Sequence, residues 1–122
     1  MNGKKDLGSW GEDRAVRFLR LHGYRIAERN FRCRQGEIDI VARKGGFIVF
    51  VEVKLRKNAD HGEAREFVTW SKQRRVICAA ELWLVKNNCE LQPRFDVIEI
   101  YAPEGTGTPL PTIRHLENAF SY

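Results

Sequence analysis

The sequence predicts a single domain of the α/β class, and three observations lead to this prediction. The chain has 122 residues, and 43% of them are hydrophobic, which is enough to build one compact core. Apolar residues recur at helical spacing in two segments and alternate as in strands in several others. The segments follow one another as helix, strand, hairpin, helix, strand, strand, an order that suits one layered α/β domain over residues 1–122.

Two segments have helical periodicity. Residues 6–22 carry an apolar stripe made of Gly11, Ala15, Phe18 and Leu19. Gly23 is a suitable stop for this helix, and Glu12 borders its apolar face. Residues 69–86 form the second predicted helix, with an inner stripe of Gln73, Val76, Ile77, Ala80 and Leu84.

The other segments alternate as strands do or are rich in turn residues. A short strand is predicted near residues 24–28, followed by the basic stretch "RNFRCRQG". Strands are also predicted at residues 94–101 and 111–116, with a loop rich in Gly and Pro between them. Residues 55–68 show no clean period, and a long polar connection of this kind is typical of a mobile or partner-contacting loop.

The stretch "GEIDIVARKGGFIVFVEVK", residues 36–54, reads as a hairpin with a two-residue turn at Gly45-Gly46. In that register Asp39 lies directly opposite Glu52, and Glu37 lies opposite Lys54. Because side chains alternate along strands, these four charged groups would share one face at the open end of the hairpin. The opposite face would be core, formed by Ile38, Ile40, Ala42, Val49, Val51 and Val53.

Two opposed carboxylates, Asp39 and Glu52, would repel each other in a half-buried site. A shared proton, neutralisation by Lys54 and nearby arginines, or a bound divalent cation would each offset this repulsion. Glu12, on a helix that borders the sheet, would supply a further oxygen for a cation. Mg²⁺ is usually held by one or two carboxylates together with water and substrate phosphate.

A metal between Asp39 and Glu52 would make this a phosphodiester hydrolysis site. The metal would polarise the phosphate and lower the pKa of a bound water, and the carbonyl of Val53 is a candidate further ligand. Lys54, one strand repeat further on, would orient that water or neutralise charge that develops on the phosphate.

The pattern of Asp39 followed by Glu52-Val53-Lys54 at the end of an apolar strand resembles the PD-(D/E)xK nuclease motif. Glu12 resembles the additional acidic residue of the branch that includes archaeal Holliday-junction resolvases. The wider pattern "RNFRCRQGEIDIVA … VFVEVKLR … KQRRVICAA … RFDVIEI" covers nearly the whole chain and is similar to the YraN family of predicted endonucleases.

This resemblance implies a restriction-endonuclease-like fold, with a mixed central sheet flanked by helices. It implies Asp39, Glu52 and Lys54 as catalytic positions, and Mg²⁺ or Mn²⁺ bound by Asp39, Glu52 and Glu12. Gln73 is similar to a helix glutamine that some branches place near the site. Ile38 departs from the proline in the motif's name, and Glu37 is an added acid that would hold Lys54 until substrate arrives.

The chain has a net charge of +5, and all of the excess lies near its beginning. Residues 1–34 carry nine Lys and Arg against four Asp and Glu, whereas residues 35–122 carry twelve against twelve. A basic region of this kind is compatible with nucleic-acid binding, and a solvated face that only aids solubility is the alternative. The candidate nucleic-acid contacts are Arg29, Arg32, Arg34, Lys72, Arg74 and Arg75.

Three functions are therefore considered. The first is a Mg²⁺- or Mn²⁺-dependent DNA endonuclease, with branched or processed DNA among its candidate substrates; the residues do not distinguish DNA from RNA. The second is a nucleic-acid-binding accessory protein that keeps the nuclease fold without catalysis. The third is a protein–protein module that uses Trp10, Phe67 and Trp70 as exposed anchors, although such aromatic residues are more often core.

The sequence also bears on assembly and on location. A nuclease of this size has little surface to hold a duplex, so a two-fold homodimer is expected, and sizing in solution would test it. No apolar run approaches the ~20 residues needed to span a bilayer, and no secretory signal is visible at the N-terminus. A cytoplasmic protein is expected, with Cys33, Cys78 and Cys89 as free thiols.

Overall fold

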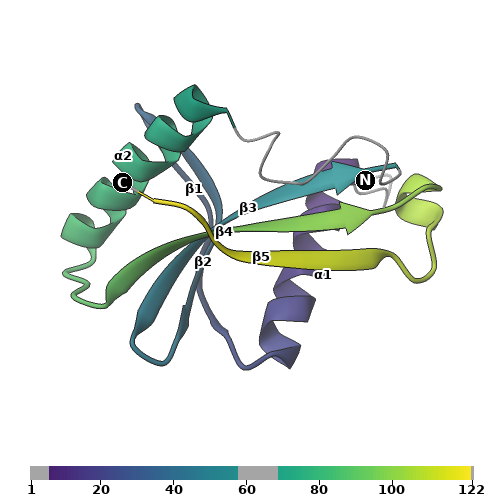
Figure 1. Ribbon diagram of the computed structural model, residues 1–122, viewed down its shortest axis with the longest axis horizontal. Coiled ribbons are helices and arrows are strands. Elements are labelled where there is room, and N and C mark those ends of the chain that lie inside the picture. Colours follow the sequence, from purple (N-terminus) through teal and green to yellow (C-terminus); the bar gives the residue numbers. More distant parts are fainter. Residues whose placement is uncertain (1–5, 58–68, 122) are drawn as a thin grey trace, which may run out of the picture.

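The computed structural model describes residues 6–57 and 69–121. Five of the described segments form one mixed sheet in the order β1-β2-β3-β4-β5, in which only β3 and β4 run parallel (Figure 1). The predicted α/β domain, with a mixed central sheet and flanking helices, is confirmed. The elements are α1 (Leu7–Leu21), β1 (Arg25–Cys33), β2 (Gly36–Lys44), β3 (Phe47–Arg56), α2 (Trp70–Lys86), β4 (Gln92–Tyr101), the short 3₁₀ helix η2 (Gly105–Gly107) and β5 (Thr112–Phe120).

Both predicted helices form, and side chains cap their first turns. The Asp6 carboxylate accepts a hydrogen bond from the Ser9 N–H at 2.7 Å at the start of α1. The Thr69 hydroxyl accepts one from the Lys72 N–H at 3.1 Å at the start of α2. Such caps satisfy backbone donors that have no partner inside the helix. Neither helix of the described chain is long and apolar enough to cross a membrane.

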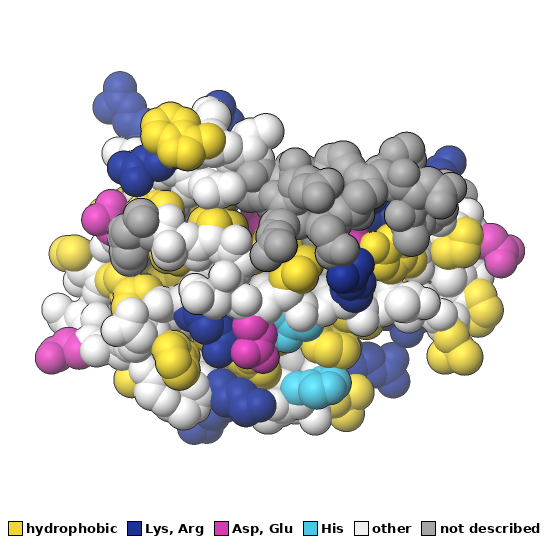
Figure 2. Space-filling view, in the orientation of Figure 1, with side chains coloured by type: hydrophobic (Ala, Val, Ile, Leu, Met, Phe, Trp, Pro, Cys, Tyr) yellow, Lys and Arg dark blue, Asp and Glu magenta, His cyan; other side chains and the backbone are white. Residues whose placement is uncertain are grey.

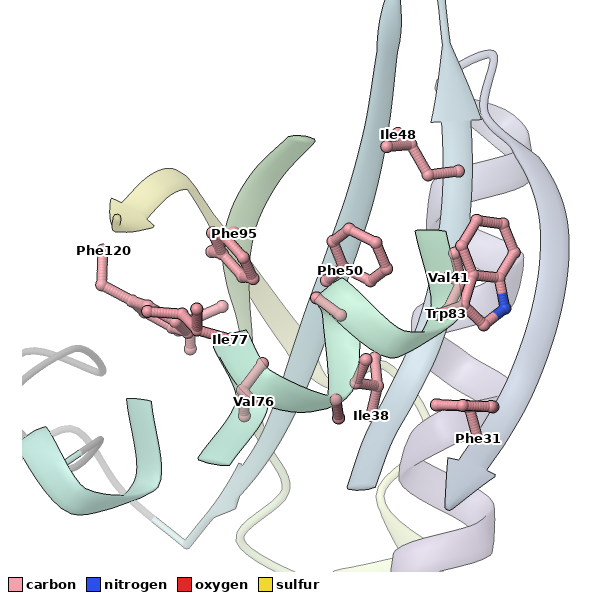
Figure 3. Close-up of a cluster of buried hydrophobic side chains, with 13 residues drawn as sticks. Phe31, Ile38, Val41, Ile48, Phe50, Val76, Ile77, Trp83, Phe95 and Phe120 are labelled. Carbon is pink, nitrogen blue, oxygen red and sulfur yellow. The ribbon is translucent and has the colours of Figure 1, made fainter. Parts of the chain in front are cut away.

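The two helices cover opposite faces of the sheet and create two hydrophobic clusters. Figure 3 shows the cluster under α2, in which Val76, Ile77 and Trp83 of the helix face aromatic and aliphatic side chains of the strands. The cluster under α1 contains Ala15, Val16, Leu19, Tyr24, Ile40, Ala42, Val49, Val51, Ile98 and Ile100. Because both faces are buried, the central strands are apolar nearly throughout, as strands covered on both faces are.

The first strand is longer than predicted. The sequence predicts a short strand at residues 24–28, but β1 runs from Arg25 to Cys33 and includes most of the basic stretch that follows. The chain then turns at Arg34 and Gln35 and returns as β2, which pairs antiparallel with β1. The full length of β1 is missed because Asn30 interrupts the alternation of side chains along the strand. Its φ of 53° lies in the left-handed region.

The alternation of β2 is interrupted at the same level. The β1–β2 pairing passes from Arg29–Ile40 to Phe31–Ile38 and omits Asn30 and Asp39. As a result Ile38 packs in the cluster under α2, whereas Ile40 packs in the cluster under α1. The prediction that Ile38 and Ile40 share one face is therefore wrong, because it assumed an undistorted strand.

Elsewhere the boundaries differ modestly from the predictions. β3 continues to Arg56, so the start of the predicted 55–68 connection belongs to a strand, and residues 58–68 lie outside the described part of the chain. β5 extends to Phe120, beyond the predicted end at residue 116. All three cysteines are free, as predicted.

Candidate active site

The site lies where the pairing of β2 with β3 ends. The backbone ladder runs from Lys44–Phe47 to Ile40–Val51, in the register that the Gly-Gly turn predicts, and Gly45 has the positive φ of 58° that a primed turn requires. One further pair in this register places Asp39 opposite Glu52. There the Asp39 side chain continues the pairing, since its Oδ2 accepts a hydrogen bond from the Val53 N–H at 2.8 Å.

The Glu52 carboxylate is nearly enclosed. Its side chain is 6% exposed, and its Oε1 lies 3.2 Å from the Nζ of Lys72, in the first turn of α2. Glu52 follows Phe50 on the face of β3 that α2 covers. The Thr69 cap begins the helix at this point and so holds Lys72 over the carboxylate. The sequence predicts Lys72 only as a nucleic-acid contact and misses this ion pair.

The surroundings of both carboxylates shift their titration. Burial first, and then the charge of Asp39, raises the pKa of Glu52 to about 7. Burial also raises the pKa of Asp39, although the Val53 hydrogen bond and the ammonium groups of Lys72 and Lys54 oppose that rise. Two acids held together with raised pKa values are typical of catalytic and metal sites, and they also occur in structural ion-pair networks.

These shifts predict a pH-dependent stability. Because the folded protein holds the Glu52 proton more tightly than the unfolded chain, folding becomes less favourable as pH rises from about 4.5 towards 7. Glu52→Gln removes that loss, so it should increase the free energy of unfolding at pH 8 by up to about 3 kcal/mol and change it little at pH 4.5. Urea unfolding in EDTA at both pH values measures the effect.

Glu81 offers a matched control because it is exposed on α2. Glu81→Gln should change the free energy of unfolding equally at both pH values. A Glu52→Gln variant that is no more stable than the wild type at pH 8 would show that the ionised carboxylate is fully compensated in the native protein.

Glu12 approaches the same region from α1. The helix lies close to β3 at Gly11, where an added Cβ would come within 3.0 Å of the Leu55 side chain. The Glu12 Oε1 accepts a hydrogen bond from the Asn30 side chain at 2.9 Å and lies 3.6 Å from the Arg29 guanidinium. Burial, followed by the charge of Asp39, raises the pKa of Glu12. The left-handed turn at Asn30 thus joins Glu12 to the site.

The side chains at the site supply some of the oxygen ligands that a small hard cation needs. Asp39 and Glu52 provide two carboxylates, the number that Mg²⁺ commonly takes when water and phosphate complete its shell. Among residues 6–57 and 69–121, however, no group of three or more His, Cys, Asp and Glu side chains is arranged to hold a metal ion. The residues therefore fit a cation held by Asp39 and Glu52, while Glu12 keeps Asn30 and Arg29 as its partners.

Glu37 does not pair with Lys54, contrary to the prediction. Its Oε2 lies 3.2 Å from the Arg32 Nε on β1, and both side chains are largely exposed. The interruption at Asp39 separates this end of β2 from β3, so the simple register fails there. Gln73 lies in the first turn of α2, next to Lys72, with its side chain half-buried.

Lys54 has a buried acidic neighbour that the sequence does not single out. In the parallel pairing of β3 with β4, Lys54 lies beside Glu99, which is fully buried. Glu99 accepts hydrogen bonds from the Arg56 guanidinium at 2.9 Å and from the Tyr101 hydroxyl. Glu99 lies four residues after Phe95 in the predicted strand at 94–101. Because side chains alternate along a strand, this spacing could have placed both side chains on the same face.

Basic residues surround the approach to the site. Figure 2 shows Lys and Arg side chains beside a hydrophobic one near the first turns of α2, where Arg74 lies over the exposed ring of Trp70. A pocket of about 300 Å³ is lined by Arg32, Cys33, Gly36, Glu37, Lys72, Arg75 and Val76. Gly36 allows β2 to pass close to α2, because a Cβ there would meet Arg75 at 3.0 Å.

The remaining candidate contacts differ in their surroundings. Arg34 is exposed in the β1–β2 turn, whereas the Arg29 guanidinium is 2.7 Å from Asp13 on α1. Among the predicted aromatic anchors, Trp70 is 75% exposed and Trp10 packs against the cluster under α1. Phe67 lies outside the described residues.

The chain is similar to many bacterial proteins of one family. A family model described as "Uncharacterised protein family UPF0102" matches residues 11–100. A UPF0102 protein of Geobacter metallireducens is 50% identical over 117 residues, which cover 95% of this chain and 93% of the relative. A UPF0102 protein of Rhodococcus opacus is 44% identical over 115 residues, covering 93% and 95%.

Proposed function

Because the chain belongs to the UPF0102 family, the YraN family that its residue pattern resembles, and because that family's description assigns no activity, we propose a function from the site: a metal-dependent DNA endonuclease. The observation that carries this proposal is the pair of carboxylates beside Lys54, in which Glu52 is buried and Asp39 is partly buried. Burial raises the pKa values of both acids, the charge of Asp39 raises that of Glu52 further, and a divalent cation would offset the cost of ionising them.

The side chains have separate roles in this proposal. Asp39 and Glu52 hold Mg²⁺ or Mn²⁺, which when bound polarises the scissile phosphate and acidifies a water molecule. The Val53 N–H fixes the rotamer of Asp39. Lys54 places a positive charge where negative charge develops on the phosphate oxygens.

The proposal predicts cleavage of DNA by the purified protein with Mg²⁺ or Mn²⁺. The assay compares linear, nicked, flapped and four-way substrates, followed on denaturing gels. Lys54→Ala should lower the cleavage rate by about 10²–10³-fold, the usual loss when one charge-stabilising group is removed. Lys86→Ala, at the far end of α2, removes the same charge away from the site and should cleave at the wild-type rate.

If none of these substrates is cut with either metal, the endonuclease proposal fails. The Lys72–Glu52 ion pair then favours a second function, a nucleic-acid-binding protein in which the charges are a structural cluster. That protein would bind DNA in a salt-sensitive manner, and Asp39→Ala and Lys54→Ala would leave its binding unchanged.

The partner under both proposals is DNA, with RNA as a competitor to be tested in the same assay. A homodimer would present two sites to a two-stranded or four-way substrate. Sedimentation of the protein alone and with a four-way junction distinguishes a stable dimer from one that forms on the substrate.

A further inference from the structure

Lys72 occupies the solvent side of Glu52. The Glu52 side chain is 6% exposed, the Lys72 side chain is 34% exposed, and 3.2 Å separates their charged atoms. The buried carboxylate is therefore paired with an ammonium whose side chain is itself partly open to solvent. A cation that binds Glu52 competes with this ammonium for the carboxylate.

Apart from its contact with Glu52, Lys72 stands where a positively charged side chain is unfavourable. It lies in the first turn of α2, a helix with no acidic residue in that turn, and the N-terminal end of a helix repels positive charge. The interaction with Glu52 offsets this repulsion. Lys72 also acts on Asp39, because its charge opposes the rise in the pKa of that acid. One ammonium thus partly neutralises both carboxylates.

Lys72 also lines the basic pocket beside the site. The pocket has a volume of about 300 Å³, and Arg32, Arg75 and Glu37 are among the residues that line it. Arg32 is largely exposed in its pair with Glu37. A backbone phosphate in this pocket would offer Lys72 a second partner, and the flexible four-carbon chain of lysine can reach either one.

We propose that Lys72 links nucleic-acid binding to cation binding: it covers Glu52 in the free protein and moves to a backbone phosphate when nucleic acid enters the pocket. This inference rests on the proposed function of Asp39 and Glu52 as cation ligands. Nucleic acid draws Lys72 away from Glu52 and so frees this carboxylate for a cation, and a cation on Glu52 frees Lys72 for a phosphate. The two ligands therefore favour each other, and the coupling is reciprocal. The free protein binds cations weakly, and the nucleic-acid complex binds them tightly.

The first test is Mn²⁺ binding without nucleic acid, followed by electron paramagnetic resonance of the free ion. Lys72→Gln removes the competing charge and should tighten Mn²⁺ binding by about tenfold, a usual size for coupling between two sites. Lys72→Arg keeps the charge and should bind Mn²⁺ like the wild type. Lys86→Gln removes one charge from the other end of the same helix and should also match the wild type.

The second test is DNA binding in EDTA, where no cleavage occurs. If Lys72 moves to a phosphate, Lys72→Gln should reduce the slope of log affinity against log salt by about one. Lys86→Gln should leave the slope unchanged. A lysine that stays on Glu52 would make no phosphate contact, and the slope would then be the same in Lys72→Gln and the wild type.

The outcomes separate this inference from the proposed function. If the wild type binds Mn²⁺ and Lys72→Gln binds it no more tightly, or if the salt slope does not change, the role of Lys72 is overturned while the cation site stands. If neither the wild type nor Lys72→Gln binds Mn²⁺, the proposed cation site is wrong, and the inference falls with it.

Discussion

Asp39→Asn is expected to abolish the Mn²⁺ binding that the wild type shows and to reduce cleavage by at least about 10³-fold, because it removes one of two charged ligands from the proposed cation site. Asparagine has the same shape, and its carbonyl oxygen can still accept the hydrogen bond from the Val53 N–H. The variant therefore removes the charge while leaving the connection between β2 and β3 intact. Mn²⁺ titration followed by calorimetry measures the first effect, and gel assays measure the second.

The same substitution should not unfold the protein, because it relieves the repulsion on Glu52. A loss of Mn²⁺ binding or cleavage in this variant therefore does not come from a loss of folding. Without the charge of Asp39, the pKa of Glu52 should fall, and the free energy of unfolding at pH 8 should equal or exceed that of the wild type. Glu81→Gln, on the exposed face of α2, is the control and should bind Mn²⁺ normally. An Asp39→Ala variant that cleaves as fast as the wild type would show that the site is assigned to the wrong residues.

Asp96→Ala is expected to cause the largest loss of stability, about 3–5 kcal/mol. Asp96 is fully buried and accepts hydrogen bonds from Arg94 at 2.7 and 2.9 Å, from the His115 ring at 2.6 Å and from the Asn118 N–H at 2.9 Å. Arg94 also donates to the Tyr24 hydroxyl at 2.6 Å. Alanine would leave these donors without their shared acceptor in a buried place.

The measurement is urea unfolding at pH 7, with Glu117→Ala as the control. Glu117 lies 3.9 Å from the same arginine, but its side chain is 61% exposed, so its removal should change the free energy of unfolding by less than about 0.5 kcal/mol. Equal stabilities for Asp96→Ala and the wild type would contradict the assignment of this network as a stabilising element.

The same network predicts sensitivity to acid. Burial alone would raise the pKa of Asp96, but hydrogen bonds from His115, Arg94 and the Asn118 N–H hold that pKa below its usual value. A lowered carboxyl pKa stabilises the fold above the unfolded value of about 3.9, and this contribution is lost as pH falls through the folded pKa. Asp96→Ala should therefore lose most of its disadvantage relative to the wild type in strong acid.

Local patterns along the chain were sufficient for most of the fold. Helical spacing and stop residues placed α1 and α2 nearly to their ends, because each helix has one continuous apolar stripe. The Gly45-Gly46 turn set the register of β2 against β3, because a two-residue turn leaves little freedom in pairing. The extent of β1 was missed because the distortion at Asn30 breaks the alternation by which strands are recognised.

The candidate site was likewise predictable from local patterns only in part. The turn and the alternation of two strands were enough to bring Asp39 towards Glu52, with Lys54 one repeat further along β3. The partners of these groups depend on segments far apart in the sequence. Glu37 binds Arg32 on a neighbouring strand, Glu12 takes part through Asn30, and no local pattern predicts either contact.

The sequence by itself determined the order of the elements, the hairpin register and the residue types at its open end, because these follow from periodicity and turn chemistry within short stretches. Only the tertiary structure decided that α2 begins over the open end and sets Lys72 on Glu52. It also decided that Asp96 and Glu99 are buried with arginine partners. The physical reason is that burial and ion pairing depend on which distant segments meet, and neighbouring residues carry no record of that.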